Sequence, residues 1–244
     1  LSGNIMSLLD RSLRKASVPN YAFCRFCYNS NKIVDASNLK LPATTLAESC
    51  YDQMFSDCTG LTKAPDIPAT NLADYCYYQM FYNCTSLTTA PELPATTLAN
   101  KCYYLMFSGC ESLTTAPELP ATKLAEYCYQ AMFYDCTSLT TAPKLPANTL
   151  ANFCYYSMFS GCTSLTRAPD LPAKTLANGC YSYMFKNCSS LNYIKMLATD
   201  ISADSCLSSW VLNVSATGTF VKSSSATWDV IASGVPSEWT VITE

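Results

Sequence analysis

Residues 93–118 read LPATTLANKCYYLMFSGCESLTTAPE, and this 26-residue block recurs along the chain with few changes. Its Leu/Ile-Pro pair and its Met-Phe pair each occur six times at constant spacing. A fixed period of this length indicates a stack of similar units, each of which buries its apolar face against its neighbours. The block therefore predicts one elongated solenoid.

The middle of the block predicts a helix. From Leu98 to Cys110 the apolar residues follow the spacing i, i+1, i+4, i+5, i+8, i+9, i+12, which places them on one broad helical face. Gly109 stands where a left-handed residue would end that helix. Other coils carry glycine, asparagine or aspartate at this position, namely Asp57, Asn83, Asp135, Gly161 and Asn187.

The end of the block predicts a short strand. Residues 113–117 read LTTAP, and proline removes a ladder hydrogen bond and so limits strand pairing. Each coil should then hold one helix and one short strand. We expect an α/β solenoid, with short parallel strands stacked on one face, helices on the other and a β-rich C-terminal cap.

The regularity of the repeat divides the chain into three parts. Residues 1–40 form an N-terminal cap and a degenerate first coil, in which Tyr21–Cys27 resembles the predicted helix. Residues 41–196 hold the six 26-residue repeats. Residues 197–244 form a last partial coil and the C-terminal cap, as the open end of a repeat stack requires.

Composition narrows the possible partners and location. The net charge is −3 and no Lys/Arg block occurs, so neither nucleic acid nor an anionic membrane surface is an expected partner. No apolar run reaches the length of a transmembrane helix, so we expect no membrane insertion. Because the chain opens Leu1-Ser2-Gly3, it is interpreted as an excised piece, with any signal or anchor outside it.

Catalytic and metal-binding chemistry finds little support. The chain has no histidine, which removes the common catalytic triads and every histidine metal site. Cys24 and Cys27 form a lone Cys-x-x-Cys without a second pair at ligand spacing. We therefore expect no enzyme activity, no cofactor and no metal.

Most of the fifteen cysteines repeat with the block. Stacked columns give parallel Cβ vectors, which is poor disulfide geometry, so we expect buried thiols that act as small hydrophobic residues. Cys24 with Cys27 is the pair most able to depart from this. The two columns are Cys50, Cys76, Cys102, Cys128, Cys154 and Cys180, and Cys58, Cys84, Cys110, Cys136, Cys162 and Cys188.

An acidic column admits two interpretations, a cation site or a solvated rim. Like carboxylates in neighbouring coils repel one another, and Lys144 interrupts the column, so the rim is favoured. The column consists of Asp66, Glu92, Glu118, Lys144 and Asp170.

Exposed tyrosines are the candidate ligand-binding residues. The unbroken column from Tyr51 to Tyr181 is expected to be half-buried helix packing, whereas the next column varies between coils. Tyrosine suits sugar or protein contacts, but the alternative interpretation, filler on a convex surface, is favoured. The candidates, expected on the helical side, are Tyr78, Tyr82, Tyr104, Tyr134 and Tyr156.

The run Met106–Leu113, followed by Leu119-Pro120, resembles the BspA-type leucine-rich repeat of bacterial surface proteins. The resemblance covers roughly residues 21–210, and the segment 217–241 is similar to a C-terminal segment of such proteins from gut Bacteroides-type bacteria. It implies export to the cell surface and a role in binding or adhesion, and it implies no catalytic residues.

We therefore predict a non-enzymatic, monomeric surface interaction module of the leucine-rich-repeat type. Its partner would be an unidentified protein or glycan, including host or extracellular-matrix molecules. The alternative is a structural stalk that presents a neighbouring domain.

Overall fold

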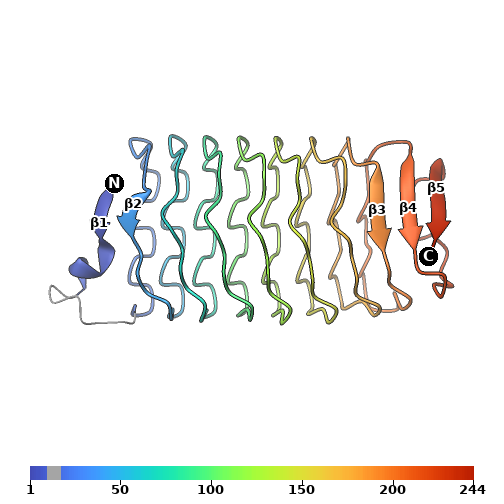
Figure 1. Cartoon of the computed structure of the whole chain (residues 1–244), viewed down its shortest axis with the longest axis horizontal. Helices are drawn as coiled ribbons and strands as arrows, with labels where there is room; N and C mark the ends of the chain where they lie inside the picture. The colour runs from blue at the N-terminus through green and yellow to red at the C-terminus, as the bar shows by residue number, and fades with distance from the viewer. Residues whose placement is uncertain (10–17) are drawn as a thin grey trace.

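The computed structural model describes residues 1–9 and 18–244, and Figure 1 shows them as coils stacked side by side along one long axis. The two termini lie at opposite ends of the stack (Figure 1). One continuous core runs from Ile5 to Trp239. The predicted solenoid is confirmed.

Regular strands occur only near the two ends of the described chain. β1 (Ser2–Asn4) pairs in parallel with β2 (Asn38–Lys40), and a 3-10 turn, η1 (Ile5–Leu8), follows β1. Near the C-terminus β3 (Tyr193–Met196), β4 (Gly218–Lys222) and β5 (Trp239–Thr243) form a parallel sheet in that order. The register pairs Tyr193 with Thr219 and Gly218 with Trp239. β4 and β5 thus continue the stack of parallel strands and make the C-terminal part of the chain β-rich.

Proline limits strand length in the coils between these ends. There the parallel pairing reduces to single bridges, such as Lys63 with Thr89 and Thr115 with Thr141. In these coils a proline follows two residues later and cannot donate to the ladder. The equivalent stretch 193–198 reads YIKMLA, without proline, and it forms β3. We call the face of the stack that carries these bridges and strands the strand side.

The opposite face is not helical, so the predicted helices are wrong. No α-helix occurs among the described residues. Instead, alternate N–H groups close β-turns: Met106 N–H donates to Tyr103 C=O at 3.2 Å. The N–H groups between them donate to the next coil, as Tyr103 does to Cys128 C=O and Leu105 to Gln130 C=O. We call this arrangement the turn ladder and its face the turn side.

The period of the apolar residues explains why this face forms turns instead of helices. An α-helix turns about 100° per residue, so a four-residue repeat drifts by about 120° over twelve residues. The turn ladder instead repeats every four residues, with a left-handed residue each time: Lys101 (φ 52°), Leu105 (φ 54°) and Gly109 (φ 74°). Two residues of each four point inward, and the strict period keeps them aligned.

The positions expected to end helices do adopt the left-handed conformation. Their φ angles lie between 55° and 79° at Asp57, Asn83, Gly109, Asp135, Gly161 and Asn187. They end no helix, because each is the last of three such residues in its coil. Glycine and asparagine occur there because a left-handed backbone costs them least.

Aromatic ladders fill the core. The Phe rings of the Met-Phe column are fully buried, and rings in successive coils stack at centroid distances of 5.5–5.8 Å. The column from Tyr51 to Tyr181 is also buried, with rings 5.7–6.0 Å apart, so the half-buried position expected for it is wrong. A period of four turns each of these tyrosines inward beside its cysteine.

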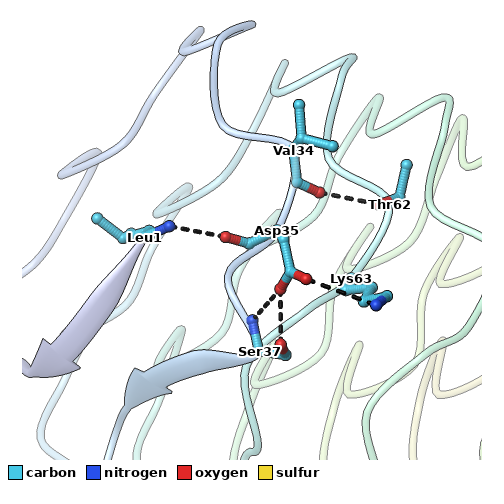
Figure 2. Close-up of polar contacts among 6 residues, drawn as sticks. All are labelled: Leu1, Val34, Asp35, Ser37, Thr62 and Lys63. Carbon is cyan, nitrogen blue, oxygen red and sulfur yellow. Dashed lines mark hydrogen bonds and ion pairs between the residues drawn. The ribbon is translucent and has the colours of Figure 1, made fainter.

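Polar contacts fix the chain where the stack begins. Figure 2 shows the Leu1 ammonium donating to Asp35 C=O at 2.7 Å and Thr62 Oγ1 donating to Val34 C=O at 2.9 Å. The Asp35 carboxylate accepts from the Ser37 N–H and hydroxyl and lies 3.6 Å from Lys63 Nζ (Figure 2). These contacts, first those from Ser37, lower the pKa of Asp35.

Three indoles fix the C-terminal coils. The Nε1–H groups of Trp210, Trp228 and Trp239 each donate to a backbone carbonyl oxygen in another part of the chain. A single hydrogen bond of this kind stabilises by about 1 kcal/mol, and the burial of the indoles adds to it.

The division of the chain into three parts, with boundaries at residues 40 and 196, remains our proposal.

Replacing Ala131 by glycine distinguishes the turn ladder from a helix. Ala131 adopts φ 51° in the middle of a segment predicted to be helical, whereas Ala125 is not left-handed. A helix would make Ala131→Gly cost about 1 kcal/mol, no less than Ala125→Gly. Because glycine relieves left-handed strain of about 1–2 kcal/mol, we expect Ala131→Gly to cost at least about 1 kcal/mol less than Ala125→Gly. Urea unfolding of both variants measures the difference, and equal losses would contradict the turn ladder.

Removing one ring from the Phe ladder should destabilise the whole stack. Phe107 is fully buried between Phe81 and Phe133. We expect Phe107→Ala to lower the free energy of unfolding by about 3–5 kcal/mol through the cavity it leaves. Thr114→Ala, at an exposed position of the same coil, is the control and should change it by less than about 0.5 kcal/mol in urea denaturation.

Candidate ligand-binding surface

The five predicted tyrosines all reach the surface of the turn side, but they do not form one cluster. Tyr134 is 39% exposed and the other four are partly exposed. Tyr78 and Tyr104 stack on each other with centroids 4.9 Å apart. Tyr156 lies two coils further along the same column, and Tyr82 and Tyr134 occupy a second column.

A third column of residues, which the sequence pattern did not reveal as a candidate, lies beside the Tyr78 column. Tyr75, Lys101, Tyr127 and Phe153 follow one another at left-handed positions. Tyr127 and Phe153 stack at 4.9 Å. Lys101 Nζ lies 5.2 Å from the ring centroid of Tyr75 and 5.1 Å from that of Tyr127, and it donates to the Tyr75 hydroxyl at 3.2 Å. A cation held between two rings is a stabilising contact.

Contacts between the columns make the aromatic residues nearly continuous. The ring centroids of Tyr75 and Tyr78 are 5.8 Å apart, and those of Phe153 and Tyr156 are 6.1 Å apart. The rings of Tyr156 and Tyr183 pack edge to face, with centroids 5.4 Å apart. We call the set the aromatic strip. It consists of Tyr75, Tyr78, Tyr104, Tyr127, Phe153, Tyr156 and Tyr183, with Lys101 bridging its two halves.

The strip offers ring edges more than ring faces. Tyr78 with Tyr104 and Tyr127 with Phe153 stack within 8° of parallel, so one face of each ring is covered by a neighbouring coil. Six of the seven rings are tyrosines, which carry hydroxyl groups at their edges. Such a surface can donate and accept hydrogen bonds along its length, and it has few open faces on which a ligand ring could stack.

One carboxyl beside the strip titrates near neutral pH. Burial raises the pKa of Asp52 to about 6, and Arg25 lowers it only in part. Its Oδ1 is buried and has no hydrogen-bond partner among the described residues. Asp52 precedes Tyr78 in the same column, and its charge contributes to the raised pKa of Tyr78 after burial and Tyr104. The charge at this end of the strip therefore depends on the protonation of Asp52.

The strand side also offers apolar surface. Two hollows of about 650 and 630 Å³ lie between adjacent coils there. Alanine and proline line much of each, for example Ala64 and Pro65 in one and Ala142 and Pro143 in the other.

The acidic column lies at the rim of these hollows. Asp66 is 3.9 Å from Lys40 Nζ, and Asp170 is 3.5 Å from Arg167, all with exposed side chains. Exposed pairs of this kind contribute little to stability. No group of three or more potential metal-ligating side chains occurs in the described part of the chain. These pairs fit a solvated rim.

The cysteines are buried free thiols, and Cys24 and Cys27 are free as well. Cys84, Cys110 and Cys136 each donate an S–H to a phenylalanine C=O in the preceding coil at 3.1–3.2 Å. Burial raises the pKa of a thiol, to about 12 for Cys50, Cys128, Cys180 and Cys188. The thiolate rather than the thiol acts as nucleophile and metal ligand, so a raised pKa disfavours both roles.

The stacked coils and their repeated core columns define a leucine-rich-repeat solenoid. The family described as BspA type leucine rich repeat region (6 copies) matches residues 16–122 and 81–209. These matches together span most of the sequence, and the chain belongs to this family.

No curated protein matches the chain. A crystal structure of a leucine-rich repeat protein from Bacteroides ovatus aligns with 93% of this chain and 78% of its own, at 16% identity and a TM-score of 0.25. A TM-score this low carries no structural argument. Within residues 1–9 and 18–244, no helix is long and apolar enough to cross a membrane.

The buried thiols should make the fold sensitive to alkali. Unfolded cysteine ionises near pH 8.5, whereas burial raises the folded pKa values well above this. Stability is then fully present below about pH 8.5 and falls as the pH rises, since only the unfolded state releases protons. At pH 9.5 each such thiol lowers the free energy of unfolding by about 1.4 kcal/mol relative to pH 7.

Guanidinium unfolding under reducing conditions at pH 7.5 and 9.5 measures this loss. The control is Cys110→Ala. Its free energy of unfolding should fall between the two pH values by about 1.4 kcal/mol less, because one buried thiol is absent. Equal free energies of unfolding at the two pH values would show that the cysteines are exposed.

Proposed function

We propose that this chain is a non-enzymatic interaction module on the outside of a bacterial cell and that its turn side is the binding face. Membership of the BspA-type family supports an exported surface protein. The aromatic strip is the observation that supports a binding role, because it places tyrosine hydroxyls along several coils of an otherwise uniform stack.

The turn side is preferred because its surface changes from coil to coil. On the strand side threonine recurs at the same two positions in most coils, whereas the columns around Tyr78 and Lys101 differ between neighbours. A surface that reads one partner must differ along its length, since each coil meets another part of that partner. Tyrosine also loses little conformational entropy on binding.

The lack of histidine and the protonated thiols support a non-enzymatic role. A nucleophilic cysteine needs an electropositive and partly exposed environment, which the apolar columns do not provide. Among the fifteen cysteines Cys24 is partly exposed, and burial and Asp52 raise its pKa as well.

A structural stalk is the second candidate. The continuous Phe and Tyr ladders favour it, because identical contacts between all neighbouring coils make a straight and stiff spacer. A stalk needs no ligand, so the two proposals differ in whether the turn side binds anything.

Binding assays separate the two proposals. The purified chain is tested against a glycan array and a panel of extracellular-matrix proteins, and any partner is then tested with Tyr78, Tyr82, Tyr104, Tyr134 and Tyr156 all changed to Ser. We expect the affinity to fall at least tenfold, the equivalent of about 1.4 kcal/mol. The matched control changes Thr62, Thr88, Thr114, Thr140 and Thr166 on the strand side to Ser.

Two outcomes contradict the proposal. If the tyrosine variant keeps its affinity and the threonine variant loses it, the strand side is the binding face. If no molecule binds the unmodified chain, the stalk is favoured.

A further inference from the structure

One column on the turn side carries an aromatic ring only in alternate coils. It reads Ser56, Tyr82, Ser108, Tyr134, Ser160 and Lys186. In the buried columns each coil supplies a ring that stacks on the next at 5.5–6.0 Å. Beside Tyr134 the following coil instead supplies Ser160, so a ring-sized space remains open there.

The space above Ser160 is a pocket of about 270 Å³. Tyr134 and Lys186 lie at its two ends along the column, and Tyr156 and Tyr183 form a side wall. We call it the Ser160 pocket. Its volume lies just below the range of pockets that hold drug-sized ligands, so it fits a single ring.

The lining is polar and carries a positive charge. Lys186, Asn187 and hydroxyls of tyrosine and serine surround the space, and no acidic residue lines it. Lys186 Nζ lies 5.3 Å from the ring centroid of Tyr183 and forms no ion pair with any described residue. Asn187 Oδ1 accepts from Asn213 Nδ2 at 2.8 Å, which leaves the Asn187 amide N–H groups as donors.

An acidic residue borders the pocket without lining it. The Asp135 carboxylate leans over Gly161, where an added Cβ would come within 1.9 Å of Asp135 Oδ1. Its charge opposes the binding of an anion nearby. Removing this charge should therefore strengthen any anion bound at Lys186.

We propose that the Ser160 pocket binds a pyranose ring that carries a carboxylate, as a unit of an acidic glycan. The carboxylate would pair with Lys186, the sugar hydroxyls would bond to tyrosine and serine hydroxyls and to Asn187, and a C–H face of the ring would rest on Tyr134. Many hydrogen-bonding groups around a small space suit a polyhydroxylated ring better than a peptide side chain. This inference rests on the proposed binding function and names the ligand class for one site.

Titration with two matched sugars tests the proposal. Methyl glucuronide and methyl glucoside differ only at C6, where the first carries a carboxylate and the second a hydroxymethyl group. Binding to the ¹⁵N-labelled chain is followed by NMR. We expect the glucuronide to bind about tenfold more tightly than the glucoside, as one charged hydrogen bond predicts. The methyl glycoside of a sialic acid, titrated in parallel, shows which kind of acidic sugar the pocket prefers.

Four variants locate the binding. Lys186→Met should reduce the affinity for glucuronide to that for glucoside, and Asp135→Asn should increase it. Tyr134→Ser should weaken both sugars about tenfold. Thr114→Ser, at an exposed position on the strand side, is the control and should change neither. Unfolding curves show that each variant is folded.

Several results would overturn the proposal. These are binding of neither acidic sugar, binding of glucuronide that is no tighter than that of glucoside when both bind, full binding by Lys186→Met, or tighter binding of a short glutamate-containing peptide than of either acidic sugar. A partner that still depends on Tyr78 and Tyr104 would then leave the proposed function intact and remove only this site.

Discussion

The structure depends on backbone hydrogen bonds between coils on the turn side. Every second N–H donates to a carbonyl of the next coil, and the N–H between closes a turn in its own coil. This alternation requires a left-handed residue at every fourth position, even where the residue is Leu105 or Tyr127. It also fixes each side chain directly beside its counterpart in the next coil, which creates the stacked aromatic columns.

The sequence predicts the stack, the buried cysteine columns and the short, proline-limited strands, because each follows from a spacing that the chain repeats. It does not predict the turn ladder as easily. Residues 98–110 place apolar pairs four apart, and over three such steps one broad helical face includes these pairs, as a four-residue turn repeat does. The two arrangements differ at the tyrosine column, which a helix would leave half-buried. The strict period of four, and the asparagine and glycine at left-handed positions, are the signals that favour turns over a helix.

The sequence predicts only part of the candidate surface. Tyr78, Tyr104 and Tyr156 are recognisable because their column varies. Lys101 and Tyr127 are not predicted because their column mixes tyrosine, lysine and phenylalanine, so it does not stand out as a tyrosine column. The Ser160 pocket arises from a small side chain between larger neighbours, and such a space becomes visible only when the neighbours in adjacent coils are known.

The direction of the hydrogen bonds between coils has a mechanical consequence. They run along the long axis of the stack, so a force that pulls the two ends apart acts directly on them. Because each coil contacts only its neighbours, the stack would yield from an end, one coil at a time. Each 26-residue coil would release about 90 Å of extended chain at about 3.4 Å per residue. A molecule held at both ends would thus lengthen in regular steps and absorb work at each one.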